Sequence, residues 1–243
     1  MKRTVVFYTN LNSRGFKIET EPEWIQERLK IWQHITLPSI LNQTHKDFKY
    51  LVFHNKKTED ITKKAIEMCG DSRVIPSFKS NGIVENVDKL PDSDIFLLTR
   101  IDSDDAYISD YAERLHDIEI KSNYIQNKDG YGLHCETGRV FNVHMNGNGP
   151  FFSRVRGRDF LSNRDMNVTA HNYASGQNLY GKNFLVSMHG TNRSTFIGGQ
   201  FGRKCVNDEI ENVDGIMEKF NINKEIIGNV KKMNGLPDPK EKS

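Results

Sequence analysis

The chain lacks an apolar run long enough to cross a bilayer, and the apolar stretch near its start, residues 4–8, is too short for a signal peptide. An excess of charge of one sign is also missing, since 34 Lys and Arg stand against 32 Asp and Glu, a formal net charge of +2. The balance gives no strong field that would favour a nucleic acid or a membrane surface as partner. We therefore expect no membrane span, and a nucleic acid acceptor is possible but not indicated.

Cysteine is scarce, and a phosphate-binding glycine loop is absent. Cys69, Cys135 and Cys205 are odd in number and widely spaced, without a Cys-x-x-Cys pair, which argues against a zinc site and favours reduced thiols in the cytoplasm. No Gly-rich loop ends in Lys-Ser or Lys-Thr, so P-loop chemistry is excluded. What the chain has is enough apolar residues, 36% of 243, to bury a core as one domain.

The most informative segment is 95–105, Ile-Phe-Leu-Leu-Thr-Arg-Ile-Asp-Ser-Asp-Asp. A short apolar strand ends there in Asp102, Asp104 and Asp105. Clustered carboxylates repel one another, and a cation relieves the repulsion. Oxygen ligands at a strand end suit a hard divalent ion such as Mg²⁺ or Mn²⁺, which keeps positions open for substrate phosphates. The alternative is a polar loop after a buried strand.

The first hundred residues predict alternating strands and helices. A capping box, Thr20-x-x-Glu23 with Pro22, predicts a helix that runs to Pro38 and a kinked or second short helix to Gln43. Thr58 and Gly70 are typical of the two ends of another helix. Strands are expected at 4–9, 50–54, 73–76 and 95–100. This order implies βαβ units, a mostly parallel sheet, and a ligand site at the carboxyl ends of its strands, near Asn10, His54, Arg100 and Asp102.

The second half is predicted to be antiparallel and rich in loops. A helix is expected after a Ser109 cap, a hairpin from 131–135 and 139–144, strands near 169–174 and 184–188, and helical structure in the last forty residues. We expect a single domain over 1–235, with a nucleotide-sugar-binding half (1–105) and an acceptor half (106–235). A disordered tail is expected at 236–243.

Several motifs along the chain resemble one family. They are Trp24-x-x-x-Arg28, Leu37-Pro-Ser39-Ile-x-x-Gln43-Thr-x-x-x-Phe48, Thr99-Arg-Ile-Asp102-Ser-Asp104-Asp105-Ala106, Pro150-Phe-Phe-Ser153 and Met188-His189-Gly190-x-Asn192. These motifs and their order along the chain resemble those of GT-A nucleotide-sugar glycosyltransferases, and more closely those of the rhamnosyltransferase-like family. The resemblance implies a GT-A-like α/β fold, with a mostly parallel, Rossmann-like central sheet, an antiparallel, loop-rich acceptor half and a helical C-terminus. It also implies a metal-dependent transfer of a sugar to an acceptor hydroxyl, and the family label suggests that this sugar is rhamnose.

The resemblance also implies roles for single residues. Asp104 would bind Mn²⁺ or Mg²⁺, Asp102 would hold the ribose or the water shell of the metal, and His189 would be the third metal ligand; imidazole favours Mn²⁺. Contacts to the UDP-, GDP- or dTDP-sugar donor would come from Asn10, His54, Arg100, Asp102 and Asn192. The strand that ends at His54 lacks the acidic residue that many such enzymes carry there, so the nucleotide is left open.

The acceptor, a glycan or another hydroxyl compound, needs a general base if the anomeric configuration inverts. Asp165 is the first candidate, followed by Glu136, Asp159 and His171. Retention and inversion both stay open. Two other functions fit the same carboxylates: a metal-dependent nucleotidyl- or phosphotransferase, and a non-catalytic module that binds carbohydrate or nucleic acid.

Overall fold

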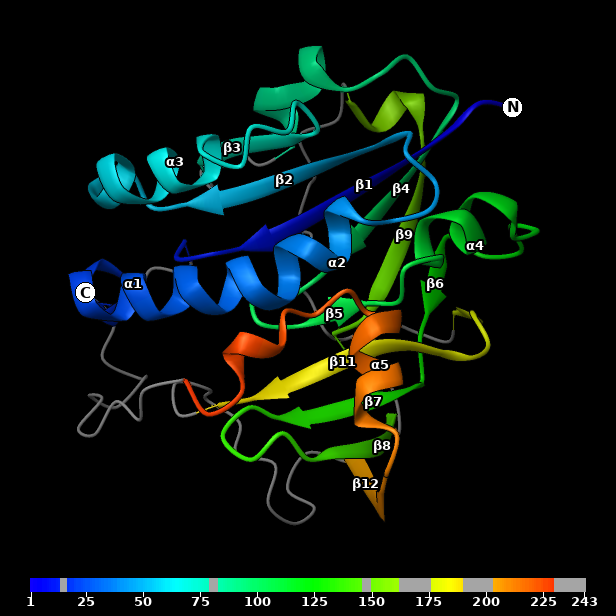
Figure 1. The fold of residues 1–243 in the computed structure, drawn as a ribbon. Coiled ribbons are helices and arrows are strands. Elements are labelled where there is room, and N and C mark those ends of the chain that lie inside the picture. Colours follow the sequence, from blue (N-terminus) through cyan, green and yellow to red (C-terminus); the bar gives the residue numbers. More distant parts are fainter. Residues whose placement is uncertain (14–16, 79–82, 146–149, 162–175, 190–202, 230–243) are drawn as a thin grey trace.

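The structure is a computed structural model of residues 1–243, and it describes residues 1–13, 17–78, 83–145, 150–161, 176–189 and 203–229. Its strands form two sheets (Figure 1). The larger sheet has the order β10-β6-β9-β4-β1-β2-β3, and the smaller has the order β12-β8-β7-β11-β5. Within the described residues, no helix combines the length and the apolar character needed to cross a membrane.

The larger sheet is mostly parallel, as predicted. β1 pairs in parallel with β2 and β4, and only β9 runs antiparallel to its two neighbours, β4 and β6. The second half of the chain therefore completes the sheet begun by the first half. The strands are β1 (Arg3–Asn10), β2 (Phe48–His54), β3 (Val74–Phe78), β4 (Ile95–Arg100), β6 (Tyr124–Gln126), β9 (Phe152–Gly157) and β10 (Gln177–Asn178).

Both faces of this sheet are covered, which explains its unbroken apolar strands. On β1, Val5 and Phe7 belong to the core formed with the helices, whereas Val6 and Tyr8 point to the opposite face, beside Ile83 and the segment that follows it. The helices that contribute to the first core are α1 (Pro22–Ile31), α2 (Leu37–Leu41), α3 (Glu59–Glu67) and α4 (Tyr111–Asp117).

The first helix continues past Pro38, as the kinked-helix prediction implied. A π-helical turn, Trp32–Thr36, joins α1 to α2, and Pro38 lies in the first turn of α2, where a missing N–H costs little. The predicted capping box is wrong. The N-cap is Glu21, and the Thr20 hydroxyl instead donates to the carbonyl of Lys17, because a 3₁₀ turn precedes the helix.

The other predicted helix ends are correct in position but differ in detail. Thr58 is the N-cap of α3, yet its hydroxyl accepts no hydrogen bond from the first turn of the helix and instead donates to the Asn55 carbonyl. Gly70 has a φ of 65°, the left-handed conformation that ends a helix. The N-cap of α4 is Asp110, one residue after the predicted Ser109.

The smaller sheet contains the predicted hairpin and carries α5 (Val213–Lys219); Met217 of α5 and Phe220, the residue after it, pack on the core of this sheet. Its strands are β5 (Ala106–Tyr107), β7 (Asp129–His134), β8 (Val140–Met145), β11 (Lys182–Met188) and β12 (Arg203–Glu209). The C-terminus was expected to be helical, and α5 is; residues 203–209 instead form a strand, because pairing with β8 overrides their weak local preference. The strand expected at 169–174 and the tail at 236–243 lie outside the described residues.

Candidate functional site

The loop with the three carboxylates crosses from one sheet to the other. β4 belongs to the larger sheet, whereas β5, which follows the loop, pairs antiparallel with β11 of the smaller sheet. The strand order reverses between β1 and β4, since β2 and β3 continue on the other side of β1. Open α/β sheets bind ligands in the crevice at such a switch point. The loop therefore lies where the topology predicts a ligand site.

Asp104 is at the centre of a small buried cluster. Its Oδ2 lies 2.8 Å from Nη1 of Arg28 on α1 and 3.1 Å from Nε2 of His189, which directly follows β11. The side chains of Asp104 and Arg28 are 13% and 12% exposed, and that of His189 is fully buried. One carboxylate thus brings together a helix and the ends of two strands from different sheets.

The pKa values of Asp104 and His189 depend on their burial and on the contacts within the cluster. Burial opposes ionisation of Asp104, but Arg28 and His189 together outweigh it and hold the pKa of the carboxyl below its usual range. Burial lowers the pKa of His189, although its contact with Asp104 works in the opposite direction. Burial and the contact with Asp104 therefore act on His189 in opposite directions, and the neutral imidazole that burial favours is the form that binds metal ions.

Asp102 and Arg100 form a second ion pair beside this cluster. Asp102 Oδ1 lies 2.6 Å from Nη2 of Arg100, and among the described residues Asp102 does not join Asp104 and His189 in a group of three that could hold a metal ion. The Tyr107 hydroxyl donates to the Arg100 carbonyl at 2.6 Å, and the Thr36 hydroxyl donates to the Asp102 carbonyl at 3.5 Å. The family resemblance implied that Arg100 would either position the carboxylates or contact the donor, and the ion pair shows that it positions Asp102.

Asp105 has a structural role in the same loop. Its Oδ1 accepts a hydrogen bond from the backbone N–H of Ser187 on β11 at 3.0 Å. The residue is 5% exposed. This bond fastens the loop to β11 two residues before His189, so Asp105 positions the contact between Asp104 and His189.

The metal ligands suggested by the sequence are brought together only in part. Within the described residues, no group of three or more His, Cys, Asp or Glu side chains could hold a metal ion. Asp104 Oδ2 and His189 Nε2 do lie 3.1 Å apart. Two neighbouring ligands of an octahedral ion, each about 2.1 Å from it, are separated by about 3 Å. The pair therefore fits two adjacent positions of one ion.

Two predicted donor contacts lie at the expected edge of the sheet in different environments. Asn10 ends β1, is partly exposed, and its Oδ1 accepts a hydrogen bond from the Ser13 hydroxyl at 3.0 Å. His54 is 3% exposed; its Nδ1 lies 3.2 Å from the Thr62 hydroxyl, and its ring packs on Phe78. Burial lowers the pKa of His54. Asn10 is thus accessible to a donor, whereas His54 is enclosed between β2, β3 and α3.

The candidate bases are separated by the structure. Glu136 is exposed in the turn after β7, and β7 runs parallel to β11, so Glu136 lies at the same end of the smaller sheet as His189. Asp159 lies in a 3₁₀ turn beyond Gly157, which pairs with the first residue of β4. That is the opposite end of β4 from Asp102, about 17 Å along the strand. Asp165, His171 and Asn192 lie outside the described residues.

Sequence reasoning assigned no role to Arg28, although this residue has a short contact with Asp104. The family resemblance had drawn attention to Trp24-x-x-x-Arg28, and in the structure the Arg28 guanidinium lies over the Trp24 ring, 5.1 Å from its centroid. The buried Nε of Arg28 has no hydrogen-bond partner within the described residues, and neither does Oε2 of its neighbour Glu27. The motif Trp24-x-x-x-Arg28 was the only sequence signal that pointed to Arg28.

Comparison with known proteins shows the family of the chain. A family model described as "Putative rhamnosyl transferase" matches residues 8–155, more than half of the chain. The chain belongs to this family, and the matched range includes Arg28, Asp102 and Asp104. No curated protein shows significant similarity to the chain.

Solved structures resemble the chain only distantly. The apo-form glycosyltransferase GlyE of Streptococcus pneumoniae TIGR4 is 11% identical with a TM-score of 0.41, over 94% of this chain and 62% of GlyE. The inositol-1-phosphate CTP transferase of T. maritima is 12% identical with a TM-score of 0.34, over 77% of this chain and 84% of that one. The chain thus spans about three fifths of the length of GlyE.

Proposed function

We propose that the protein is a metal-dependent glycosyltransferase of the GT-A type, which transfers a sugar from a nucleotide-sugar donor to an acceptor hydroxyl. The observation that supports this most directly is the contact of Asp104 with both His189 and Arg28, at the switch point of the larger sheet. The family of the chain makes glycosyl transfer the expected reaction.

Asp104 and His189 would hold a divalent cation, Mn²⁺ or Mg²⁺, through Oδ2 and Nε2. When bound, such an ion acts as a Lewis acid that neutralises charge on a departing diphosphate. Asp102, held by Arg100, would orient a water molecule or the ribose. Ser187 and Asp105 keep the loop at β11, so the two proposed ligands meet without a further rearrangement of the sheets.

Arg28 would contact the diphosphate of the donor. Its guanidinium is largely buried beside Asp104, and its Nε is a buried donor without a partner within the described residues. A planar guanidinium matches phosphate oxygens in two-point contacts. Such a fixed cation stabilises the negative charge that develops on the leaving group. Asn10, at the accessible end of β1, would contact the ribose or the base.

The acceptor hydroxyl would lose its proton to a carboxylate on the side of the smaller sheet. Glu136 is the described candidate, because it lies at the same end of that sheet as His189. Asp165 stays a candidate outside the described residues. The structure does not bring Asp159 to this region, so we do not include it. We expect the reaction in the cytoplasm, where the thiols of Cys69 and Cys135 would stay reduced.

The test is a donor screen of the whole chain. Purified protein would be incubated with Mn²⁺ or Mg²⁺ and with UDP-, GDP- and dTDP-sugars, dTDP-rhamnose among them. Release of nucleoside diphosphate and the thermal unfolding midpoint would be measured. We expect at least one donor to be hydrolysed slowly and to raise the midpoint only with metal present. CTP and UTP in the same panel test nucleotidyl transfer, since their consumption instead of a nucleotide sugar would overturn the proposal.

Matched variants make the screen specific. Asp104→Asn and His189→Ala should lose at least a hundredfold in donor hydrolysis, whereas Asp47→Asn, a change of the same kind at an exposed position, should keep wild-type activity. If Asp104→Asn hydrolyses the donor as fast as the wild type, the proposed site is wrong. Arg28→Lys should raise the KM for the donor, since a point charge cannot replace the two-point contact.

A further inference from the structure

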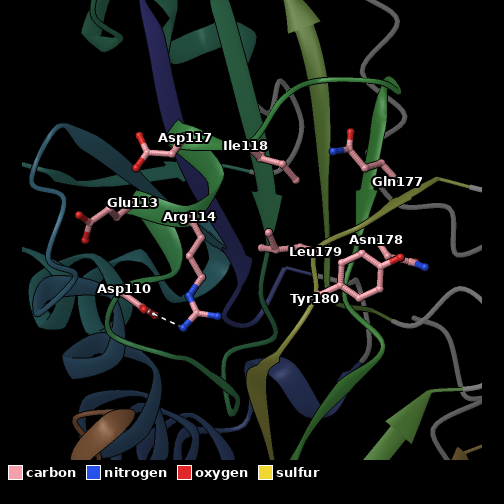
Figure 2. Close-up of a pocket in the computed structure, with 9 residues that line it drawn as sticks. All are labelled: Asp110, Glu113, Arg114, Asp117, Ile118, Gln177, Asn178, Leu179 and Tyr180. Atoms are coloured by element: carbon pink, nitrogen blue, oxygen red, sulfur yellow. Dashed lines mark hydrogen bonds and ion pairs between the residues drawn. The ribbon is translucent and has the colours of Figure 1, made fainter.

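A groove separate from the Asp104 cluster lies between α4 and the segment around β10. Its volume is about 640 Å³, within the range of small-molecule sites. Figure 2 shows α4 supplying one wall, with Arg114 and Asp110 joined by an ion pair, and Leu179 and Tyr180 on the other wall. The groove is open along its length rather than enclosed.

Tyr180 is an unusual feature of this groove. Its side chain is 82% exposed, whereas the other large apolar side chains that are exposed in the described residues, Met1, Ile61 and Met68, are not aromatic. Exposing a tyrosine ring beside a groove forgoes the burial that aromatic residues normally obtain. A flat, accessible ring with a polar edge is suited to stack on a ligand that has an apolar face and polar rim.

The two walls are held together by a fully buried side chain, that of Asn183. Its Nδ2 donates to the carbonyls of Leu179 at 2.9 Å and Tyr180 at 3.4 Å. Its Oδ1 accepts from Nη1 of Arg114 on α4 at 3.1 Å. Gly181 follows with a φ of 105°, which favours glycine, and a Cβ there would lie 2.9 Å from the same guanidinium. The backbone that presents Tyr180 is therefore fixed before any ligand binds, which lowers the entropic cost of binding.

Polar side chains on both walls of the groove are available to hydrogen-bond a ligand (Figure 2). Asn178 accepts from Gln126 through Oδ1, and its amide nitrogen donates no hydrogen bond within the described residues. Asp117 on α4 is 71% exposed, and Asp110 has one oxygen, Oδ1, that is buried and without a partner in the described part of the chain. The groove thus offers carboxylate acceptors, an amide donor and an aromatic ring.

From this arrangement we propose that the groove binds a saccharide unit, stacked on Tyr180 and hydrogen-bonded through its hydroxyl groups to Asn178 and the α4 carboxylates. A sugar ring has an apolar C–H face for the tyrosine, and neighbouring hydroxyls that donate to carboxylates and accept from amides. The lining contains three carboxylates, those of Asp110, Glu113 and Asp117, against one guanidinium, that of Arg114, and this balance disfavours nucleic acid.

A peptide is a poorer fit to the same groove. Peptides commonly add a strand to a free sheet edge, and β10 is the edge strand of the larger sheet. However, β10 consists of only Gln177 and Asn178, and the Gln177 side chain is bonded to the backbone of Glu119 and Lys121. An edge this short provides too few main-chain hydrogen bonds for augmentation.

The groove lies apart from the site proposed for sugar transfer. α4 runs back along the larger sheet, and the carbonyls of His116 and Ile118 at its far end accept hydrogen bonds from Arg3, the first residue of β1. The carboxylates of the loop after β4 lie at the other end of these strands. A saccharide bound here would belong to an acceptor glycan, at a point remote from the hydroxyl that reacts. Only this link to an acceptor rests on the proposed function.

Saturation-transfer NMR on the whole chain tests the proposal. The probes would be defined trisaccharides of glucose, N-acetylglucosamine and rhamnose, with an uncharged peptide and a short single-stranded DNA as comparison ligands. We expect at least one trisaccharide to bind in the millimolar range. Tyr180→Ala should weaken this binding at least tenfold and Asn178→Ala severalfold, whereas Tyr180→Phe, which keeps the ring, should bind nearly as the wild type does.

Other outcomes would overturn the proposal. They are the absence of binding by every trisaccharide, preferential binding of the peptide or the DNA, and binding that survives Tyr180→Ala. Binding lost in Asp104→Asn but kept in Tyr180→Ala would place the saccharide at the transfer site instead. Donor hydrolysis by Tyr180→Ala should equal that of the wild type, so a failure of this inference is distinguishable from a failure of the proposed function. Circular dichroism of each variant checks that it is folded.

Discussion

The carboxylate of Asp105 accepts a hydrogen bond from the backbone N–H of Ser187, and through this bond the loop after β4 is tied to β11. Asp105→Ala would leave that N–H buried without a partner, at a cost of about 1–3 kcal/mol. Urea unfolding should show this loss, and donor affinity should fall with it, because His189 lies two residues after Ser187. Asp47→Ala, at an exposed position, should change stability by less than about 0.5 kcal/mol. Equal stabilities of the two variants would contradict a structural role for Asp105.

Asp104 should make stability depend on pH in the acid range. Its pKa is lowered in the folded state, so it contributes stability above the pKa of the unfolded chain, about 4, and this contribution is lost as the pH falls further. Asp104→Asn leaves Arg28 buried without its partner and should cost about 3 kcal/mol at pH 7. The difference in unfolding free energy between wild type and variant should narrow below pH 4. A difference that is constant from pH 7 to pH 3 would show that the ion pair does not contribute.

His54 should matter for stability rather than for donor binding. Burial lowers its pKa, so the unfolded chain takes up a proton near pH 6.5 while the folded chain does not, and stability falls as the pH drops below that value. His54→Gln should flatten the stability profile between pH 6.5 and 5 and leave the KM for the donor unchanged. His116→Gln, at a half-exposed position, controls for the loss of a histidine. If the KM for the donor rises in His54→Gln but not in His116→Gln, His54 contacts the nucleotide of the donor after all.

Gly130 should tolerate no side chain. A Cβ there would lie 2.4 Å from the Phe184 carbonyl oxygen and 2.5 Å from its ring, which stacks on Phe151 with centroids 4.1 Å apart. Gly130→Ala should therefore push β7 from β11 and destabilise the protein by about 1–3 kcal/mol. Gly132→Ala is the matched control on the same strand, because its nearest contacts, at 3.2 and 3.4 Å, are side-chain atoms. Equal unfolding midpoints for the two variants would contradict this account.

Much of the larger sheet could be predicted because its strands are apolar without interruption and alternate with helices. The carboxylate loop was placed correctly for the same reason: Asp102 follows a buried strand directly. The contact of Arg28 with Asp104 could not be derived, because it depends on how α1 approaches the loop, and helical periodicity does not encode that approach. Thr20 failed as a cap because a 3₁₀ turn offered its hydroxyl a nearer acceptor. The strand at 203–209 was missed because only its pairing with β8 makes it a strand.

The short strand β5 has a consequence for how such an enzyme could be re-engineered. Because β5 joins the smaller sheet directly after the carboxylate loop, a chimera that replaces the second half of the chain must keep the pairing of Ala106 and Tyr107 with β11. Without that pairing, His189 would no longer be held opposite Asp104, even with every donor-side residue unchanged. The two halves of the chain are therefore not separable modules, and grafts that exchange them should preserve β5 and β11 together.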